Sequence, residues 1–188
     1  MPEIPEDRCE RAKLFKAIDD AFRAGDFEGL GLALGGSERW VDEKMPFELG
    51  LGYPLEYAIY WSPVTFIEKL IKAGSNPNYG DDGGFPSIIA ALSTNRGDKM
   101  EIVQVLLNYG ADPDRRGVND WTPLHYAVSI RDLIAMSLLL ASGADPRLRT
   151  RIDDYSTALE EAEQAGFGPE AALLQEAMTH HQGSSYGD

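Results

Sequence analysis

Several short segments carry side chains whose types and spacing could support metal chemistry. Residues 112–117 (DPDRRG) place carboxylates at the first and third positions and glycine at the sixth position of a calcium-binding loop. The fifth position is Arg116, however, and the twelfth is Pro123, where a bidentate glutamate is required. The sequence therefore predicts no calcium site here, and we interpret the segment as a connecting turn.

Other segments resemble catalytic or phosphate-binding motifs only in part. Residues 81–84 (DDGG) form an acidic turn that lacks the Gly-Lys-Ser/Thr ending of a phosphate loop, and their two carboxylates would repel phosphate. Cys9 lies in an acidic segment that disfavours a thiolate. His125 is the one histidine outside the C-terminal tail, and no acid or base partner for it is apparent. The sequence predicts no enzyme, no metal site and no cofactor.

The composition indicates one folded, acidic domain. Of the 188 residues 43% are hydrophobic and 26% are charged, which is ordinary for a folded domain. With 17 Lys and Arg against 31 Asp and Glu, the formal net charge is −14, which repels nucleic acid and anionic membranes. Two interpretations of this charge remain open: attraction of a partner with a basic surface, or solubility alone.

The same features suggest a location in the cell. A single cysteine excludes an internal disulfide and fits a reducing compartment. The acidic start has no positively charged region followed by an apolar stretch, and no apolar run reaches the roughly eighteen residues of a membrane span. We expect a cytoplasmic protein that is monomeric when free.

The elements that would position any site come from an internal repeat. One pattern occurs three times, at residues 70–77 (LIKAGSNP), 106–113 (LLNYGADP) and 139–146 (LLASGADP). The copies are separated by 36 and then 33 residues, which is the length of one supersecondary unit. This period predicts a stack of similar helical units.

Residues 121–127 (WTPLHYA) resemble the ankyrin repeat, whose first helix typically opens with Thr-Pro-Leu-His. Thr122 can cap the helix, and Pro123 fits its first turn because no amide donor is lost there. Weaker copies stand at residues 53–58 (YPLEYA) and 157–162 (TALEEA). The resemblance implies that His125 makes structural hydrogen bonds to neighbouring turns.

One copy departs from this frame, and both ends are degenerate. Residues 85–91 (FPSIIAA) put Pro86 at the threonine position, and three extra residues then belong in the polar turn at 95–98 (NRGD) between two helices. Residues 14–28 resemble a first repeat with Gly25 at the turn between its helices, and residues 169–178 indicate the last helix. Terminal repeats need such polar caps.

The resemblance therefore predicts an all-α ankyrin-repeat solenoid of about five helix-turn-helix repeats with short β-turn or hairpin connections. We expect an N-terminal extension at 1–10, the repeat domain at 11–178 and a flexible tail at 179–188. The expected repeats span residues 11–42, 43–79, 80–115, 116–148 and 149–178.

In proteins of this family, turn tips and first helices form a concave groove that holds partners. Phe85 and Trp121 precede the openings of two first helices and should project from adjacent tips. Tyr60, Trp61 and Ile130 stand near the ends of first helices, at positions that vary freely in the family. The remaining predicted contact residues are acceptors on the same tips: Asp81, Asp82, Asn119 and Asp120.

Alternative roles stay open for several of these residues. Trp61 could equally bind a partner or cover the next helix layer, and Trp121 could equally bind a partner or pack on neighbouring tips. Packing of these two kinds is favoured for Tyr60 and Phe85. Aromatic side chains nevertheless dominate many binding surfaces. The arginines of the last connection could contact an acidic partner, or they could pair with nearby carboxylates: Arg147, Arg149 and Arg151, facing Asp145, Asp153 and Asp154.

Two functional classes fit these expectations. The first is a non-catalytic module that binds a partner protein through the groove and inhibits or neutralises it. The second is a structural or regulatory subunit of an enzyme complex. Because one fold serves many functions, the sequence does not name the partner.

Overall fold

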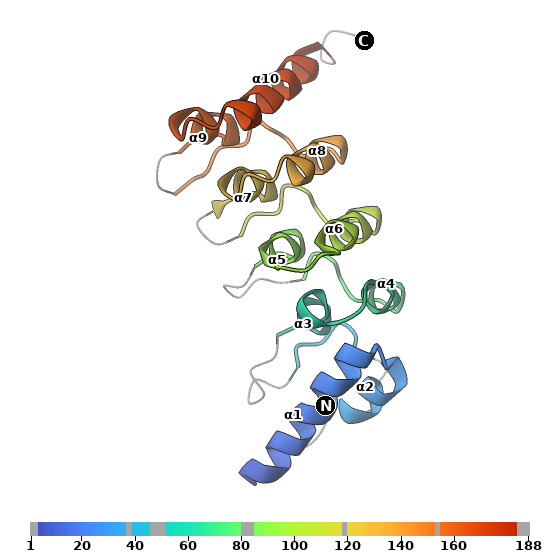
Figure 1. The fold of residues 1–188 in the computed structure, drawn as a ribbon. Coiled ribbons are helices and arrows are strands. Elements are labelled where there is room, and N and C mark those ends of the chain that lie inside the picture. Colours follow the sequence, from blue (N-terminus) through green and yellow to red (C-terminus); the bar gives the residue numbers. More distant parts are fainter. Residues whose placement is uncertain are drawn as a thin grey trace.

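The computed structural model describes residues 4–36, 39–45, 52–79, 85–117, 120–152 and 155–183. Ten helices occur in these residues, and successive helices form five antiparallel pairs (Figure 1). We call the first helices of the pairs the first row. They are α1 (Arg8–Ala24), α3 (Pro54–Trp61), α5 (Ser87–Ser93), α7 (Pro123–Ser129) and α9 (Ala158–Gln164).

The second helices of the pairs form the second row. They are α2 (Phe27–Ala33), α4 (Val64–Lys72), α6 (Lys99–Asn108), α8 (Leu133–Ala141) and α10 (Gly168–Gly183). Each first-row helix contacts the next along the chain, from α1 to α9, whereas second-row contacts are closest between α4 and α6 and between α8 and α10. The pairs rise in chain order from α1 to α10, as Figure 1 shows. The prediction of an all-α solenoid of five repeats is confirmed.

Local chemistry explains where the central helices begin. The Thr122 hydroxyl accepts a hydrogen bond from the backbone N–H of His125, and Pro123 occupies the first turn of α7. At α9 the Thr157 hydroxyl accepts from the N–H of Glu160, whose carboxylate accepts from the N–H of Thr157 at 2.9 Å. This reciprocal pair is a capping box. The helix starts predicted from the repeat are therefore correct at both positions.

A glycine ends the second helix of each central pair. Gly110 follows α6 with φ of +87°, a left-handed conformation that disfavours side chains. The next N–H, of Ala111, donates to the carbonyl of Leu106 at 2.9 Å, which closes the helix end. Gly74 and Gly143 also have positive φ. The glycine recurs at this position of the repeat because the backbone there is left-handed.

The buried core is a continuous column of aliphatic and small side chains between the two rows. Ala90, Ala127 and Ala158 are almost fully buried on consecutive first-row helices. Small side chains there allow the helices to approach closely, while Leu106 and Leu139 fill the space on the second row. Each repeat thus depends on its neighbours for burial.

The predicted insertion lies between α5 and α6. Residues 94–98 connect these helices, whereas residues 62–63 suffice between α3 and α4. Arg96 anchors the longer loop by donating to both carboxylate oxygens of Asp98, at 2.8 and 2.7 Å, and to the carbonyl of Ile59 at 3.3 Å. The loop therefore also satisfies a carbonyl near the end of α3.

Both terminal helices extend beyond the expected domain boundaries at 11 and 178. The helix α1 begins at Arg8 because the Asp7 carboxylate accepts from the N–H groups of Cys9 and Glu10, each at 2.9 Å. The helix α10 continues to Gly183 and so includes residues 179–183 of the expected tail. No proline or glycine interrupts the chain between Met178 and Gly183, so nothing local ends the helix earlier.

Tight turns connect the pairs, as predicted. An isolated antiparallel bridge joins Arg149 and Thr157 before α9, and the N–H of Gly117 donates to the carbonyl of Trp121 before α7. Over the described ranges no longer strand occurs. We call these connections the tips of the repeats.

Candidate protein-binding surface

The first-row helices at the centre of the stack present few side chains to solvent. Most residues of α3, α5 and α7 are buried. The partly or largely accessible ones are Glu56, Tyr57, Tyr60, Trp61, Ser93, Tyr126 and Ser129. Four of these are aromatic and two are serines, while α5 and α7 contain no Asp, Glu, Lys or Arg.

Tyr126 of α7 lies next to both aromatic residues predicted at the tips. Its ring centroid is 6.3 Å from that of Phe85 and 6.5 Å from that of Trp121, with interplanar angles of 58° and 65°. All three rings are partly accessible. The structure therefore brings Phe85 and Trp121 together through a residue that the sequence reasoning did not single out.

Tyr60 extends this group along the first row. Its hydroxyl lies 3.5 Å from the hydroxyl of Ser93 on the next first-row helix. Burial, and then the neighbouring Tyr60, raises the pKa of the Tyr126 phenol, which therefore stays neutral at physiological pH. We call Tyr60, Phe85, Ser93, Trp121 and Tyr126 the aromatic band.

Trp61 occupies a separate position at the end of α3. It is 49% exposed, and the Arg23 guanidinium lies 4.5 Å above its ring. Arg23 also pairs with Asp19, at 2.9 Å, and the Asp19 carboxylate accepts from the Tyr57 hydroxyl at 2.6 Å. Trp61 is thus exposed on one side and held on the other by α1.

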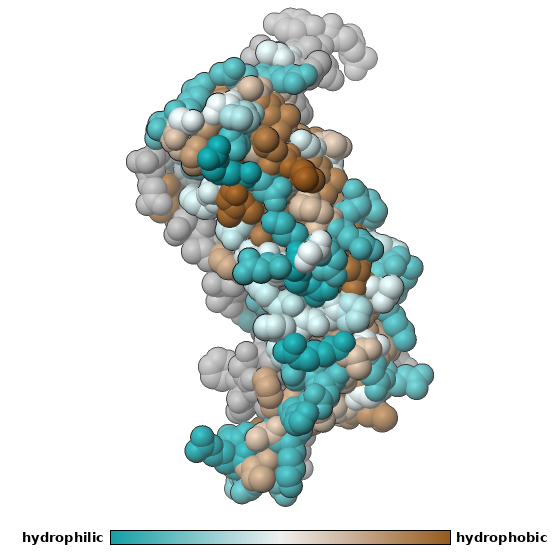
Figure 2. Space-filling view, viewed as in Figure 1, coloured by the Kyte–Doolittle hydropathy of each residue, from teal (hydrophilic) through white to brown (hydrophobic). Residues whose placement is uncertain are grey.

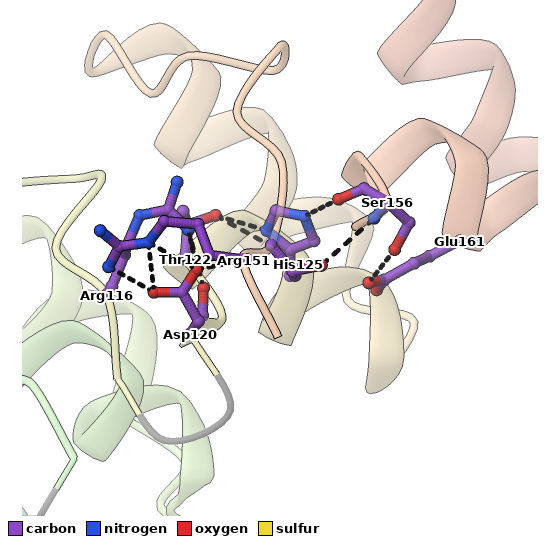
Figure 3. Close-up of polar contacts among 8 residues, drawn as sticks. Arg116, Asp120, Thr122, His125, Arg151, Ser156 and Glu161 are labelled. Carbon is purple, nitrogen blue, oxygen red and sulfur yellow. Dashed lines mark hydrogen bonds and ion pairs between the residues drawn. The ribbon is translucent and has the colours of Figure 1, made fainter. Parts of the chain in front are cut away.

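Asp120 was predicted as an exposed acceptor beside Trp121, and this prediction is wrong. The residue is 7% exposed, and its carboxylate accepts from Arg116 and Arg151, each at 2.6 Å (Figure 3). The Arg151 hydrogen bond holds the pKa of the Asp120 carboxyl below its ordinary value. Arg151 lies on the next tip, so the carboxylate joins two repeats.

The expected pairing of the arginine stripe is correct in part. Arg147 pairs with Asp145 at 2.8 Å, as predicted. Arg149 instead pairs with Glu160 at 2.7 Å, and Arg151 pairs with Asp120. Asp153 and Asp154 lie outside the described residues, as do Asp81, Asp82 and Asn119.

His125 makes structural hydrogen bonds, as the repeat pattern implied. Its Nε2 lies 3.2 Å from the carbonyl oxygen of Ser156, which can only accept, so Nε2 carries the proton (Figure 3). Its Nδ1 then accepts from the Thr122 hydroxyl at 2.8 Å. Burial lowers the pKa of the imidazole, which fits a neutral structural ring.

A ladder of hydrogen bonds joins the tips, and the sequence reasoning missed it. The Asn78 side chain accepts from the N–H of Asp112 at 2.8 Å, and the Asp114 carboxylate accepts from the N–H of Asp145 at 3.0 Å. The recurring Asn-Pro-Asn and Asp-Pro-Asp sequences were the available signal. The carboxylates of the rejected calcium loop thus serve as acceptors for backbone amides. Arg147 holds the equivalent position in the next repeat. Its side chain has no hydrogen-bond acceptor, so the ladder ends there.

Ile130 is 39% exposed but lies outside the aromatic band. It follows α7 and stands three residues before the start of α8, where Leu133 is 38% and Ile134 is 71% exposed. Figure 2 shows apolar surface gathered around α7 and α8, amid mostly polar surface elsewhere on this side. Ile130 therefore belongs with an aliphatic patch at the α7–α8 turn.

A pocket of about 510 Å³ lies beside α2, and none of the predicted contact residues that the structure describes lines it. Its lining includes Phe27, Leu32 and Trp40. Across the described ranges, no three His, Cys, Asp or Glu side chains come together as metal ligands. None of the described helices has both the length and the apolar character needed to span a membrane.

Five stacked helix pairs, glycine-terminated second helices and the Thr-Pro start of α7 define an ankyrin-type solenoid. The chain belongs to the ankyrin repeat family, because the family model for ankyrin repeats in three copies matches residues 55–150. The match covers the central repeats, as predicted, and leaves out both terminal pairs. Ankyrin repeats generally mediate protein–protein interaction.

Among similar proteins are Ankyrin repeat protein nuc-2 of Neurospora crassa and human Ankyrin repeat domain-containing protein 13B. The first is 34% identical over 50% of this chain and 9% of its own length, and the second is 32% identical over 60% and 18%. Glycerophosphocholine phosphodiesterase gde1 of Schizosaccharomyces pombe is 37% identical over 54% and 8%. The chain spans less than a fifth of each of these relatives. The similarity to gde1 covers a small part of that enzyme.

Proposed function

We propose that this chain is a non-catalytic module that binds one partner protein through the aromatic band and Trp61, and that binding inhibits or neutralises the partner. The observation that carries the proposal is the gathering of Phe85, Trp121 and Tyr126 on a partly accessible surface. Aromatic rings contribute large contact areas at low cost in side-chain entropy.

The charge of the molecule supports a partner with a basic surface. A net charge of −14 produces a long-range field that attracts such a partner and accelerates the encounter. Contact at the aromatic band itself would involve uncharged groups. Long-range attraction and short-range recognition would thus depend on different residues, in a cytoplasmic protein that is monomeric before it binds.

The proposal is tested by isolating a partner with the tagged protein and measuring its affinity for substituted chains. We expect the double substitution Trp61→Ala and Trp121→Ala to weaken binding at least tenfold, because each indole contributes more than about 1 kcal/mol where it is a hot spot. Leu32→Ala is the matched control, since Leu32 is 76% exposed on α2, away from the band.

Circular dichroism should show the same helical content in all three proteins, which separates lost contacts from lost folding. Equal affinity of the double variant and the control would disprove the assignment of the surface. An assay of the partner then distinguishes the two functional classes. Inhibition on binding supports the proposal, whereas a partner that is inactive without this chain indicates a regulatory subunit.

A further inference from the structure

The aromatic band differs chemically from the rest of the molecule. Charged residues make up 26% of the chain, yet α5 and α7 contain none. The one charged residue of α3 is Glu56, whose carboxylate is half-buried and accepts from the N–H of Tyr53 at 3.4 Å. A partner segment on this surface would meet rings and hydroxyl groups, so a charged side chain there would lose hydration without gaining an ion pair.

The structure disfavours three common ways of binding a peptide. Addition of a β-strand needs an exposed sheet edge, and in the parts of the chain that are described the extended pairing is limited to the bridge between Arg149 and Thr157. Recognition of acidic or phosphorylated segments needs available arginines, but Arg116 and Arg151 both pair with Asp120. Docking of an amphipathic helix needs a hydrophobic groove, whereas three of the five residues of the band carry hydroxyl groups.

A mode that suits the aromatic band is recognition of a polyproline II helix by aromatic side chains. The spacing of the rings fits this conformation. Tyr126 lies 6.3 Å from Phe85 and 6.5 Å from Trp121, centroid to centroid. Two residues of a polyproline II helix rise about 6.2 Å, so alternate residues of such a segment match successive rings.

The polar groups of the band fit the same ligand. A polyproline II segment makes no internal hydrogen bonds, and its carbonyl oxygens need donors. The Ser93 hydroxyl already donates to the carbonyl of Ala90 at 2.7 Å. Tyr126 supplies a hydroxyl group, and Trp121 supplies an indole N–H. These groups can donate without introducing charge, so the band can satisfy carbonyls while its rings contact the proline rings.

We propose that the aromatic band binds an uncharged, proline-rich segment of the partner in the polyproline II conformation. This inference rests on the proposed function and specifies the chemistry of the partner at that surface. The segment lies across Phe85, Tyr126 and Trp121, and its carbonyl oxygens accept from the Tyr126 hydroxyl and the Trp121 indole N–H.

The test uses three synthetic peptides of equal length as probes: oligoproline, a Gly-Ser repeat and an amphipathic Leu-Lys helix. Binding is followed by NMR through the indole N–H signals and the backbone amides of Ser93 and Tyr126. Oligoproline should produce saturable shifts at Trp121 and at these amides. Trp40 is 8% exposed and lies beside α2, so its signal is an internal control that should not move.

Salt dependence and single substitutions provide further tests of the same binding. Because the contact is uncharged, the dissociation constant should change less than twofold between about 0.05 M and about 0.5 M NaCl. Trp121→Ala should raise it about tenfold. Tyr126→Phe, which keeps the ring and removes the donor, should raise it several-fold, whereas Tyr109→Phe, directly after α6, should have no effect.

Absence of shifts with oligoproline overturns the inference, as do equal shifts with the Gly-Ser peptide or shifts with the amphipathic helix alone. The proposed function is judged separately by the affinity of the isolated partner for the Trp61 and Trp121 variants. If that affinity falls while oligoproline fails to bind, the surface assignment stands and the polyproline II ligand is rejected.

Discussion

His125 is a histidine whose hydrogen bonds fix its tautomer. The Ser156 carbonyl accepts from Nε2, and the Thr122 hydroxyl accepts from the His125 backbone N–H and donates to Nδ1. A second proton on Nδ1 would oppose this donor and would place a charge in a buried site. The ring therefore joins the start of α7 to the next tip as a neutral group.

We expect this arrangement to make stability depend on pH. Burial lowers the pKa of folded His125 below its ordinary value of 6.5, so the unfolded chain takes up the proton first. The stabilisation is therefore complete above pH 6.5 and is lost as the pH falls below 6.5 toward the folded pKa. Urea unfolding from about pH 7.5 to about pH 5.5 measures the loss.

The substitution His125→Gln should remove most of this slope, because glutamine can still donate to Ser156 but does not titrate. If the free energy of unfolding changed with pH in the same way for the parent chain and His125→Gln, the neutral structural role of His125 would be contradicted. Glu56 and Asp114, whose pKa values burial raises, contribute equally to every curve.

At the level of elements, the tips are joined by side chains that accept from the backbone of the next repeat. Asn78 and Asp114 hold equivalent places in successive repeats, one as an amide and one as a carboxylate. The carboxylate gains no ion pair from this role, and burial raises the pKa of Asp114. The acceptor oxygen, rather than the charge, is therefore the structural requirement.

Two substitutions separate the acceptor from the charge. Asp114→Ala should lower the free energy of unfolding by about 1–2 kcal/mol, because the N–H of Asp145 loses its acceptor. Asp114→Asn keeps an acceptor and should leave stability equal or slightly higher at neutral pH. Since the folded pKa is raised, any gain over the parent chain should disappear as the pH falls through it. Urea unfolding measures the free energy of unfolding of both variants. Equal losses of stability in Asp114→Ala and Asp114→Asn would disprove this account.

At the scale of the whole molecule, the chain is a linear stack in which each pair contacts its neighbours. First-row contacts are continuous from α1 to α9, so the central pairs have neighbours on both sides and the terminal pairs on one. Loss of packing at an end should therefore remain local, whereas loss at the centre should affect both halves.

Leu106 of α6 and Leu174 of α10 form a matched test, because both side chains are fully buried. Replacement of either by alanine should cost about 2–5 kcal/mol locally. Hydrogen exchange should then rise in α9 and α10 alone for Leu174→Ala, and from α3 to α8 for Leu106→Ala. Identical exchange patterns in the two variants would show that the stack unfolds as one unit.

The sequence by itself determined the repeat, its register and where the central helices begin and end. Thr122, Pro123 and Gly110 act through backbone groups within a few residues, so their types and spacing are sufficient. The insertion at 95–98 was predictable for the same reason, because the frame on either side of it was defined. The helix α10 ran past its expected end because a helix without a breaker does not signal its last residue.

Only the tertiary structure decided which polar and aromatic residues are available to a partner. Asp120 appeared to be a free acceptor, but Arg151, 31 positions away in the chain, contacts it from the next tip. Tyr126 was overlooked as a repeat residue, yet it links Phe85 and Trp121. Periodicity specifies what each repeat contains, whereas the exposure and charge of a tip depend on side chains from neighbouring repeats and on the distances that packing sets between them.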